Sequence, residues 1–148
     1  MILNQAFLFV TISIHNSDTM TDTILLEDRF PIHPDLLYNA WLDSGEHSAF
    51  TGSEASIDPQ VGGGYTAWNK YIHAVFLDLQ PGERILQKWR TTDFPEHHQD
   101  SVLEIQLQEI PEGCLMRMIH TGLPSGTEEE YKKGWVEYYL KPMKQYFK

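Results

Sequence analysis

The C-terminal segment of the chain carries an apolar surface that constrains the fold of everything before it. Apolar side chains recur in residues 131–147 at the three- and four-residue intervals of an α-helix. Lysine and glutamate gather on the opposite face at four-residue spacing. A helix with so wide an apolar arc must lie against a broad apolar partner, and a curved sheet provides one. The arc consists of Tyr131, Trp135, Val136, Tyr138, Tyr139, Leu140, Pro142, Met143, Tyr146 and Phe147.

A few residues predict the geometry of this helix. Thr127 followed by Glu130 fits a capping box and predicts a helix that begins near Glu128. Pro142 removes one helical hydrogen bond, so the last turns should bend and follow a curved surface. Gly134 costs a helix interior about 1 kcal/mol relative to alanine. We expect this glycine to allow a close approach to the sheet, so that Gly134→Ala destabilises the fold by crowding.

The segment before this helix predicts a series of antiparallel strands. Between residues 54 and 122, runs of apolar and β-branched residues are separated by the turn signals PQVGG, QPGE and PEGC. Apolar and polar residues alternate in 101–110, and Arg117 marks the solvent face of the next strand. The opposite face of that strand should point toward the helix, and it carries Cys114, Met116, Met118 and His120.

The N-terminal half completes the fold class. Residues 24–32 predict a strand, and residues 33–43 predict a helix with Pro34 in its first turn. A second short helix is predicted over residues 46–50. The order predicts an α+β domain: a curved antiparallel β-sheet wraps around a long C-terminal α-helix, with two short helices after the first strand.

Length, charge and cysteine content limit the function classes. The 148 residues suit one domain, which we place at residues 20–148. A net charge of −10 repels nucleic acid and anionic lipid, so we expect no nucleic-acid partner and no membrane insertion. The single Cys114 cannot form an intramolecular disulfide and is typical of a buried apolar residue in a reducing compartment. We therefore predict a cytoplasmic protein.

Residues 1–19 have two interpretations. The apolar stretch AFLFVTISI, residues 6–14, is too short to span a bilayer and lacks the flanks of a signal peptide. Met20 begins a segment typical of the start of a cytoplasmic domain, which makes residues 1–19 an N-terminal extension without fixed structure. Their strand propensity equally predicts an extra β-strand on a sheet edge or on a second copy. Both interpretations stay open, as does the choice between monomer and dimer.

No short motif identifies a reaction. VGGGY at residues 61–65 lacks the spacing of a phosphate-binding loop and predicts a turn. We expect no cofactor, because no cofactor fingerprint is present. His120 is a weak candidate for a general base because of its inward direction, and a hydrogen-bonded core histidine is the alternative. We also expect no metal, because adjacent histidines on a loop diverge in the one polar cluster, which contains Asp93, Glu96, His97, His98 and Asp100.

Four segments together resemble one protein family: DPQVGGGYTAW, LDLQPGERILQKWR, EGCLMRMIHTGLP and YKKGWVEYYLKPMKQY. They are similar to the activator of heat shock protein 90 ATPase homologue (Aha-type) family, within the START-like, or SRPBCC, superfamily of helix-grip domains. The resemblance extends over residues 24–148. It implies a sheet that grips the C-terminal helix, commonly with an apolar cavity between them. Its most specific points are Gly62–Gly63, Pro81, Trp89–Arg90, the run from His120 to Pro124, and Gly134–Trp135.

The resemblance implies several functions. Eukaryotic members assist a chaperone ATPase, whereas neighbouring START-like families bind lipids or polyketides, or cyclise aromatic polyketides. We expect a single domain without the separate N-terminal domain that accompanies the chaperone-activating module in eukaryotes, and this expectation weakens that assignment. The family often has glycine at the positions of Lys70 and Ala74. We therefore expect the strand over residues 71–79 to sit differently and to narrow the cavity.

We expect a cytoplasmic, non-enzymatic domain that binds a small apolar or aromatic molecule between the sheet and the C-terminal helix. The competing structural interpretation is a filled core. The functional alternatives are a stress-response module that modulates a heat shock protein 90 type ATPase, and a polyketide-cyclase-like enzyme with His120 as base. The residues expected to line the cavity are Trp68, Ile72, Trp89, Leu103, Ile105, Met116, Met118, His120, Trp135, Tyr138 and Tyr139.

Overall fold

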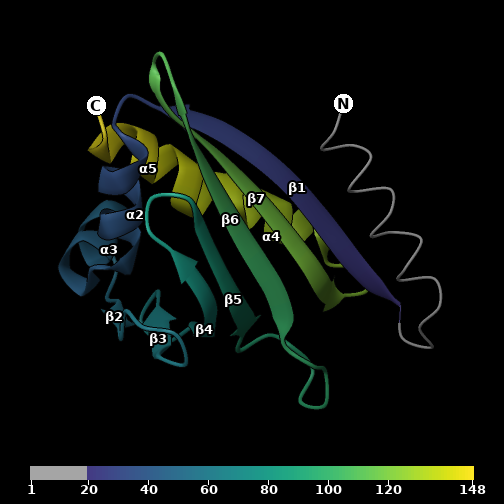
Figure 1. The fold of residues 1–148 in the computed structure, drawn as a ribbon. Coiled ribbons are helices and arrows are strands. Elements are labelled where there is room, and N and C mark those ends of the chain that lie inside the picture. Colours follow the sequence, from purple (N-terminus) through teal and green to yellow (C-terminus); the bar gives the residue numbers. More distant parts are fainter. Residues whose placement is uncertain (1–19) are drawn as a thin grey trace.

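The computed structural model describes residues 20–148. Within these residues, seven strands form one antiparallel sheet in the order β1-β7-β6-β5-β4-β3-β2. Figure 1 shows a curved sheet with the C-terminal helical segment lying across one of its faces. The predicted α+β helix-grip fold is confirmed. The strands are β1 (Thr21–Phe30), β2 (Ser56–Ile57), β3 (Gly64–Ala67), β4 (Ile72–Gln80), β5 (Arg84–Thr91), β6 (Ser101–Ile110) and β7 (Gly113–Pro124).

Strands β6 and β7 provide the apolar floor beneath the helix. Residues that face each other across an antiparallel pair project from the same side of the sheet. The facing pairs here are Leu103–His120, Ile105–Met118 and Leu107–Met116, and all six residues are buried. The predicted inward direction of Cys114, Met116, Met118 and His120 is confirmed. Arg117 projects from the opposite face, where its Nε lies 3.3 Å from a carboxylate oxygen of Glu27.

Two short helices follow β1, as predicted. Helix α2 (Pro34–Leu42) begins after His33, whose Nδ1 accepts a hydrogen bond from the Asp35 amide at 3.1 Å. Helix α3 (Ser44–Thr51) begins after Asp43, and its bounds are wider than the predicted residues 46–50. Both helices bury apolar side chains in the common core, among them Trp41, which is 0% exposed. They pack at the end of the sheet where the chain terminates (Figure 1).

The C-terminal helix consists of three segments: α4 (Glu128–Trp135), the π-helical η1 (Val136–Leu140) and α5 (Lys141–Tyr146). The predicted start at Glu128 is confirmed, but the predicted capping box is wrong. Thr127 Oγ1 donates its hydrogen bond to the carbonyl of Pro124 instead of accepting one from the first turn. The amide of Glu128 donates to Asp22 Oδ2 at 2.9 Å, so strand β1 supplies the cap.

The π-turn lies directly before Pro142. The amide of Lys141 bonds to the carbonyl of Val136, five residues earlier, as a π-turn requires. A proline has no amide donor, and its ring collides with the carbonyl four residues earlier in a regular α-helix. A wider turn at this place relieves that collision. The irregularity expected at Pro142 therefore takes the form of a π-turn, and this turn borders the pocket described below.

No helix among residues 20–148 is long and apolar enough to cross a membrane. The two interpretations of residues 1–19 concern a segment outside the described residues.

Candidate ligand pocket

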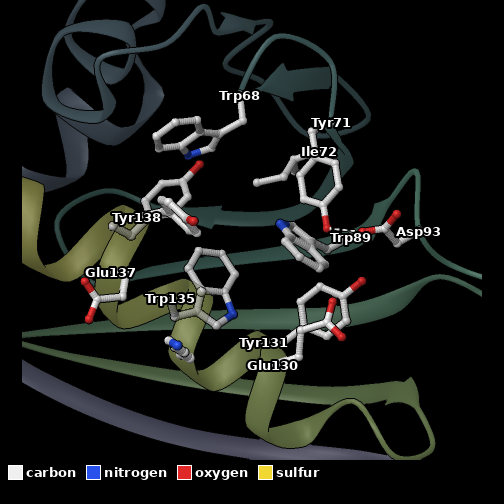
Figure 2. A pocket seen from close by; sticks show the side chains of 13 residues that line it. Trp68, Tyr71, Ile72, Trp89, Asp93, Glu130, Tyr131, Trp135, Glu137 and Tyr138 are labelled. Atoms are coloured by element: carbon white, nitrogen blue, oxygen red, sulfur yellow. Dashed lines mark hydrogen bonds between the residues drawn. The ribbon is translucent and has the colours of Figure 1, made fainter.

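A pocket of about 710 Å³ lies between the C-terminal helix and the part of the sheet formed by β4, β5 and the turn that joins β3 to β4. Figure 2 shows Trp68, Tyr71 and Ile72 on one side and Trp135 and Tyr138 of the helix on the other. Seven of its residues are aromatic, so stacking surface dominates the lining. The residues that line it are Trp68, Tyr71, Ile72, Trp89, Asp93, Glu130, Tyr131, Lys133, Gly134, Trp135, Glu137, Tyr138 and Tyr139.

The structure divides the residues predicted to line a cavity into two groups. Six of them line the pocket: Trp68, Ile72, Trp89, Trp135, Tyr138 and Tyr139. The other five lie in the packed core with at most 1% exposure and do not line it: Leu103, Ile105, Met116, Met118 and His120. Sequence reasoning missed the residues of the pocket's polar rim and Tyr71 and Tyr131. Tyr131 belonged to the predicted apolar arc, which was the available signal.

A hydrogen-bond chain joins the helix to three strands beneath the pocket. The indole Nε1 of Trp135 donates to His120 Nδ1 at 3.0 Å. His120 Nε2 lies 2.8 Å from Ser101 Oγ, which donates to the carbonyl of Trp89 at 2.6 Å. An indole nitrogen can only donate, so Nδ1 is the acceptor and the proton of the neutral imidazole sits on Nε2. The polar side-chain atoms of Trp135, His120 and Ser101 therefore each have a complementary partner.

The surroundings of His120 favour its structural role. Burial lowers the pKa of His120 to about 3, because a charged imidazole would lose its hydration. Both ring nitrogens are bonded to protein groups, and the residue does not line the pocket. A general base needs a nitrogen within reach of its substrate. The geometry therefore supports the hydrogen-bonded core histidine over the catalytic alternative.

A second buried histidine, which sequence reasoning missed, anchors the π-turn. The hydroxyl of Tyr139 lies 2.9 Å from His47 Nε2, and His47 Nδ1 lies 2.8 Å from the carbonyl of Trp41. Because a carbonyl only accepts, His47 carries its proton on Nδ1 and accepts from Tyr139 on Nε2. Burial lowers the pKa of His47 to about 4. This contact connects α3 to the wall of the pocket.

The mouth of the pocket is built from irregular backbone. Trp68, Asn69 and Lys70 have φ values of 53°, 53° and 70°, a left-handed conformation that is unfavourable for residues with a Cβ. Lys70 occupies a position where the resemblance implies glycine, which adopts this conformation without strain. The Trp68 ring packs edge-on against Tyr138 of the π-turn, with ring centroids 5.4 Å apart. Ala74, the other departure, does not line the pocket.

The rim of the pocket is acidic. Its charged residues are Asp93, Glu130 and Glu137 against the single Lys133. Asp93 accepts a hydrogen bond from the Tyr71 hydroxyl at 2.7 Å, which Figure 2 marks. Burial, together with this carboxylate, raises the pKa of Tyr71. Because the rim carries more carboxylates than ammonium groups, it favours neutral or cationic molecules over anions.

Arg90 binds groups of the loop at residues 93–100. Arg90 Nη1 lies 2.8 Å from Asp100 Oδ1 and donates to the carbonyl of His98 at 2.9 Å. In the part of the chain that the structure describes, no group of three or more His, Cys, Asp or Glu residues is placed to hold a metal ion.

Comparison with known proteins gives the family. The family model described as "Activator of Hsp90 ATPase homolog 1-like protein" matches residues 31–148. The chain belongs to this family. Its relatives include the activator of 90 kDa heat shock protein ATPase homolog 1 of Homo sapiens, 30% identical over 127 residues, or 86% of this chain and 37% of the relative. The Dictyostelium discoideum homolog is 24% identical over 127 residues, or 86% and 33%. The chain thus spans about a third of these relatives' length.

Solved structures share the fold of this family member. An HSP90 activator from Plasmodium falciparum, PFC0360w, superposes with a TM-score of 0.73 at 23% identity, covering 84% of this chain and 93% of that one. CalU16 from Micromonospora echinospora has a TM-score of 0.73 at 20% identity, covering 86% and 76%. DynU16, from the dynemicin biosynthetic locus, has a TM-score of 0.71 at 15% identity, covering 84% and 46%. At these identities the likeness shows the fold alone.

Gly134 does not bring the helix close to the sheet, so that expectation is wrong. A Cβ added at this position would meet no atom within 4 Å. Gly134 lines the pocket, next to Trp135 on the helix. The glycine therefore leaves open space beside the pocket wall instead of allowing contact with the sheet.

We predict that Gly134→Ala raises the melting temperature. Alanine stabilises a helix interior by about 1 kcal/mol relative to glycine, and the added methyl group enters empty space. Thermal unfolding followed by circular dichroism measures the change. Gly63→Ala is the control and should lower the melting temperature, because its Cβ would collide with the backbone oxygen of Asp58. A lower melting temperature for Gly134→Ala would show that the site is crowded.

We also predict that acid destabilises the domain through its two buried histidines. His47 and His120 stay neutral in the folded state, with pKa values of about 4 and about 3, whereas the unfolded chain protonates them near 6.5. Their contribution is therefore complete above about pH 6.5 and is lost as the pH falls toward 4, at up to about 1.4 kcal/mol per pH unit for each histidine.

The measurement is the urea-unfolding free energy of wild type, His47→Gln and His97→Gln at pH 7, 6 and 5. His47→Gln removes one of the two proton-binding groups, so its free energy should fall less steeply with pH than that of wild type. His97, which is exposed, serves as the matched control and should keep the wild-type slope. Equal slopes for all three proteins would show that His47 does not contribute to the pH dependence.

Proposed function

We propose that this domain binds a small apolar aromatic molecule in the pocket beside its C-terminal helix. The observation that carries the proposal is a cavity of about 710 Å³ with seven aromatic residues in its lining. This volume lies within the usual range for small-molecule sites, which are concave and mostly apolar. A filled core is close-packed, and that interpretation fits the adjacent layer of Leu103, Ile105 and Met118 instead.

The aromatic walls are held in position before any ligand arrives. Trp135 is fixed by His120, Tyr139 by His47, and the Tyr131 hydroxyl by Thr91 Oγ1 at 2.7 Å. Side chains that are already ordered lose little conformational entropy on binding, so a rigid pocket favours affinity. The same hydrogen bonds occupy groups that a reaction would need. This supports a binding role in preference to a polyketide-cyclase-like one. The free, buried Cys114 separately supports a cytoplasmic location, because a reducing compartment keeps thiols unpaired.

We predict that apolar aromatic compounds stabilise the wild-type protein in a thermal-shift screen, whereas Gly134→Leu responds weakly or not at all. The leucine side chain would extend into the open space at Gly134 and occupy part of the pocket. A ligand at a hundred times its Kd stabilises the folded state by about 2.7 kcal/mol, which such a screen detects.

Lys132→Leu is the matched control, since Lys132 is an exposed residue of the same helix that does not line the pocket. It should keep the wild-type response. A broad screen without any stabilising compound would reject the proposal. Equal responses from wild type and Gly134→Leu would place the ligand elsewhere.

A second candidate function is a chaperone-associated module. The supporting observation is the 30% identity to the human activator of 90 kDa heat shock protein ATPase homolog 1 over 127 residues. The chain corresponds to 37% of that relative, so activation by the whole protein does not transfer directly. A net charge of −10 would suit a basic patch on a chaperone, because complementary charge accelerates association.

The test of this second function uses the purified protein and the heat shock protein 90 type chaperone of its own organism. We expect binding at low salt that weakens as salt increases, together with a changed ATPase rate. Gly134→Leu should act like wild type, because its substitution lies in the pocket. Absence of both binding and an ATPase change would reject the candidate without affecting the ligand proposal.

A further inference from the structure

Polar atoms of the pocket's aromatic residues differ in whether they have a partner. In four of these residues the polar side-chain atom is hydrogen-bonded to another protein group. Tyr138 is 59% exposed to solvent. Among the described residues, the indole Nε1 atoms of Trp68 and Trp89 are buried and donate no hydrogen bond. Figure 2 shows both nitrogens on the ring edges directed toward the pocket, but neither atom is exposed there, so a neighbouring side chain must shift before a ligand oxygen can reach it. The four partnered residues are Tyr71, Tyr131, Trp135 and Tyr139.

An unpartnered indole N–H specifies the complementary chemistry. The group can only donate, so a ligand must present an acceptor to satisfy it. A buried donor without a partner is unfavourable, and an apolar ligand that covered it would leave this cost in place. Trp68 lies in the β3–β4 turn at the mouth, whereas Trp89 lies on β5 and is 3% exposed. The two donors therefore come from different parts of the wall.

The acidic rim decides what kind of acceptor fits. A carboxylate or phosphate would also accept from an indole, but it would enter past Asp93, Glu130 and Glu137 with Lys133 as the one cation of the lining. The carboxylate of Glu137 lies 2.8 Å from Lys141 Nζ, which offsets part of its charge. The remaining negative charge repels an anionic ligand. A neutral carbonyl oxygen accepts hydrogen bonds without this repulsion.

We propose that the pocket selects neutral, planar aromatic molecules that carry a carbonyl oxygen, and that this oxygen accepts from the indole N–H groups of Trp68 and Trp89. The inference rests on the proposed ligand-binding function and narrows it to one chemical class. The aromatic body stacks within the ring-lined walls, and the carbonyl distinguishes the bound molecule from a hydrocarbon of the same shape.

Three probes of matched shape test the proposal by titration calorimetry: 2-acetonaphthone, 2-ethylnaphthalene and 2-naphthoate. The ketone should bind about tenfold more tightly than the hydrocarbon, because a hydrogen bond that satisfies a buried donor has about this effect on Kd. The naphthoate should bind more weakly than the ketone. Trp68→Phe and Trp89→Phe each keep a ring and remove one donor, so each should lower the ratio of hydrocarbon Kd to ketone Kd.

Trp135→Phe is the control because it shortens a wall of the pocket without removing a free donor, its indole N–H being bonded to His120. It should weaken both neutral probes and keep their ratio. Trp68 lies at the mouth and is only half-buried, so Trp68→Phe serves as the test if Trp89→Phe fails to fold.

The outcomes separate this inference from the function on which it rests. Equal binding of ketone and hydrocarbon to the wild type overturns the carbonyl preference and leaves ligand binding intact. Tightest binding by the naphthoate overturns the requirement for a neutral molecule. If none of the three probes binds, the pocket function and this inference fail together. A ratio that falls equally in Trp135→Phe and in the two donor variants shows that ring size, not the N–H group, determines selectivity.

Discussion

The hydrogen bond from the indole of Trp135 to His120 fixes the C-terminal helix on the sheet. Its continuation through Ser101 to the Trp89 carbonyl joins α4 to β7, β6 and β5. These groups are buried, so breaking any one bond would leave an unsatisfied polar atom in the interior. The position of the helix then determines which part of the sheet lies under packed core and which part borders the pocket. Where β6 and β7 lie beneath the helix, Met116 and its neighbours fill the space. Toward β4, β5 and the β3–β4 turn, the space stays open.

A second neutral contact, from Tyr139 to His47, holds the π-turn and completes the attachment. Both contacts pair an aromatic residue of the helix with a histidine whose pKa burial lowers, so neither introduces a charge into the interior. A buried ion pair would need more polar groups around it to offset lost hydration. Neutral contacts avoid this requirement. They leave the aromatic rings free to form apolar walls, while ionised groups remain at the rim.

The architecture was predictable because periodicity is a local property. The aromatic arc of residues 131–147 and the alternation in β6 and β7 indicated a helix on a sheet, and they placed Met118 inward. They could not show which strands the helix packs against directly and which it leaves uncovered. For this reason Leu103 and Ile105 of β6 were expected at the cavity. Contacts between distant segments were also hidden. The cap from Asp22 reaches Glu128 across 106 positions, and Tyr139 meets His47 across 92.

The pocket region has a regular floor, formed by β6 and β7, and an irregular mouth, and the two parts differ in how much their sequence can vary. The floor consists of regular strands whose register is determined by paired backbone and packed side chains. The mouth consists of two irregular segments, the left-handed turn at Trp68–Lys70 and the π-turn at Val136–Leu140, which meet through Trp68 and Tyr138. Strained backbone persists only where its surroundings over-determine it, and such sites concentrate at ligand contacts. Structures with 15% and 23% identity share the fold, so residues outside the common packing can vary without loss of the architecture. The ligand selectivity that we propose should therefore depend on the irregular mouth and the residues it positions, more than on the sheet that supports them.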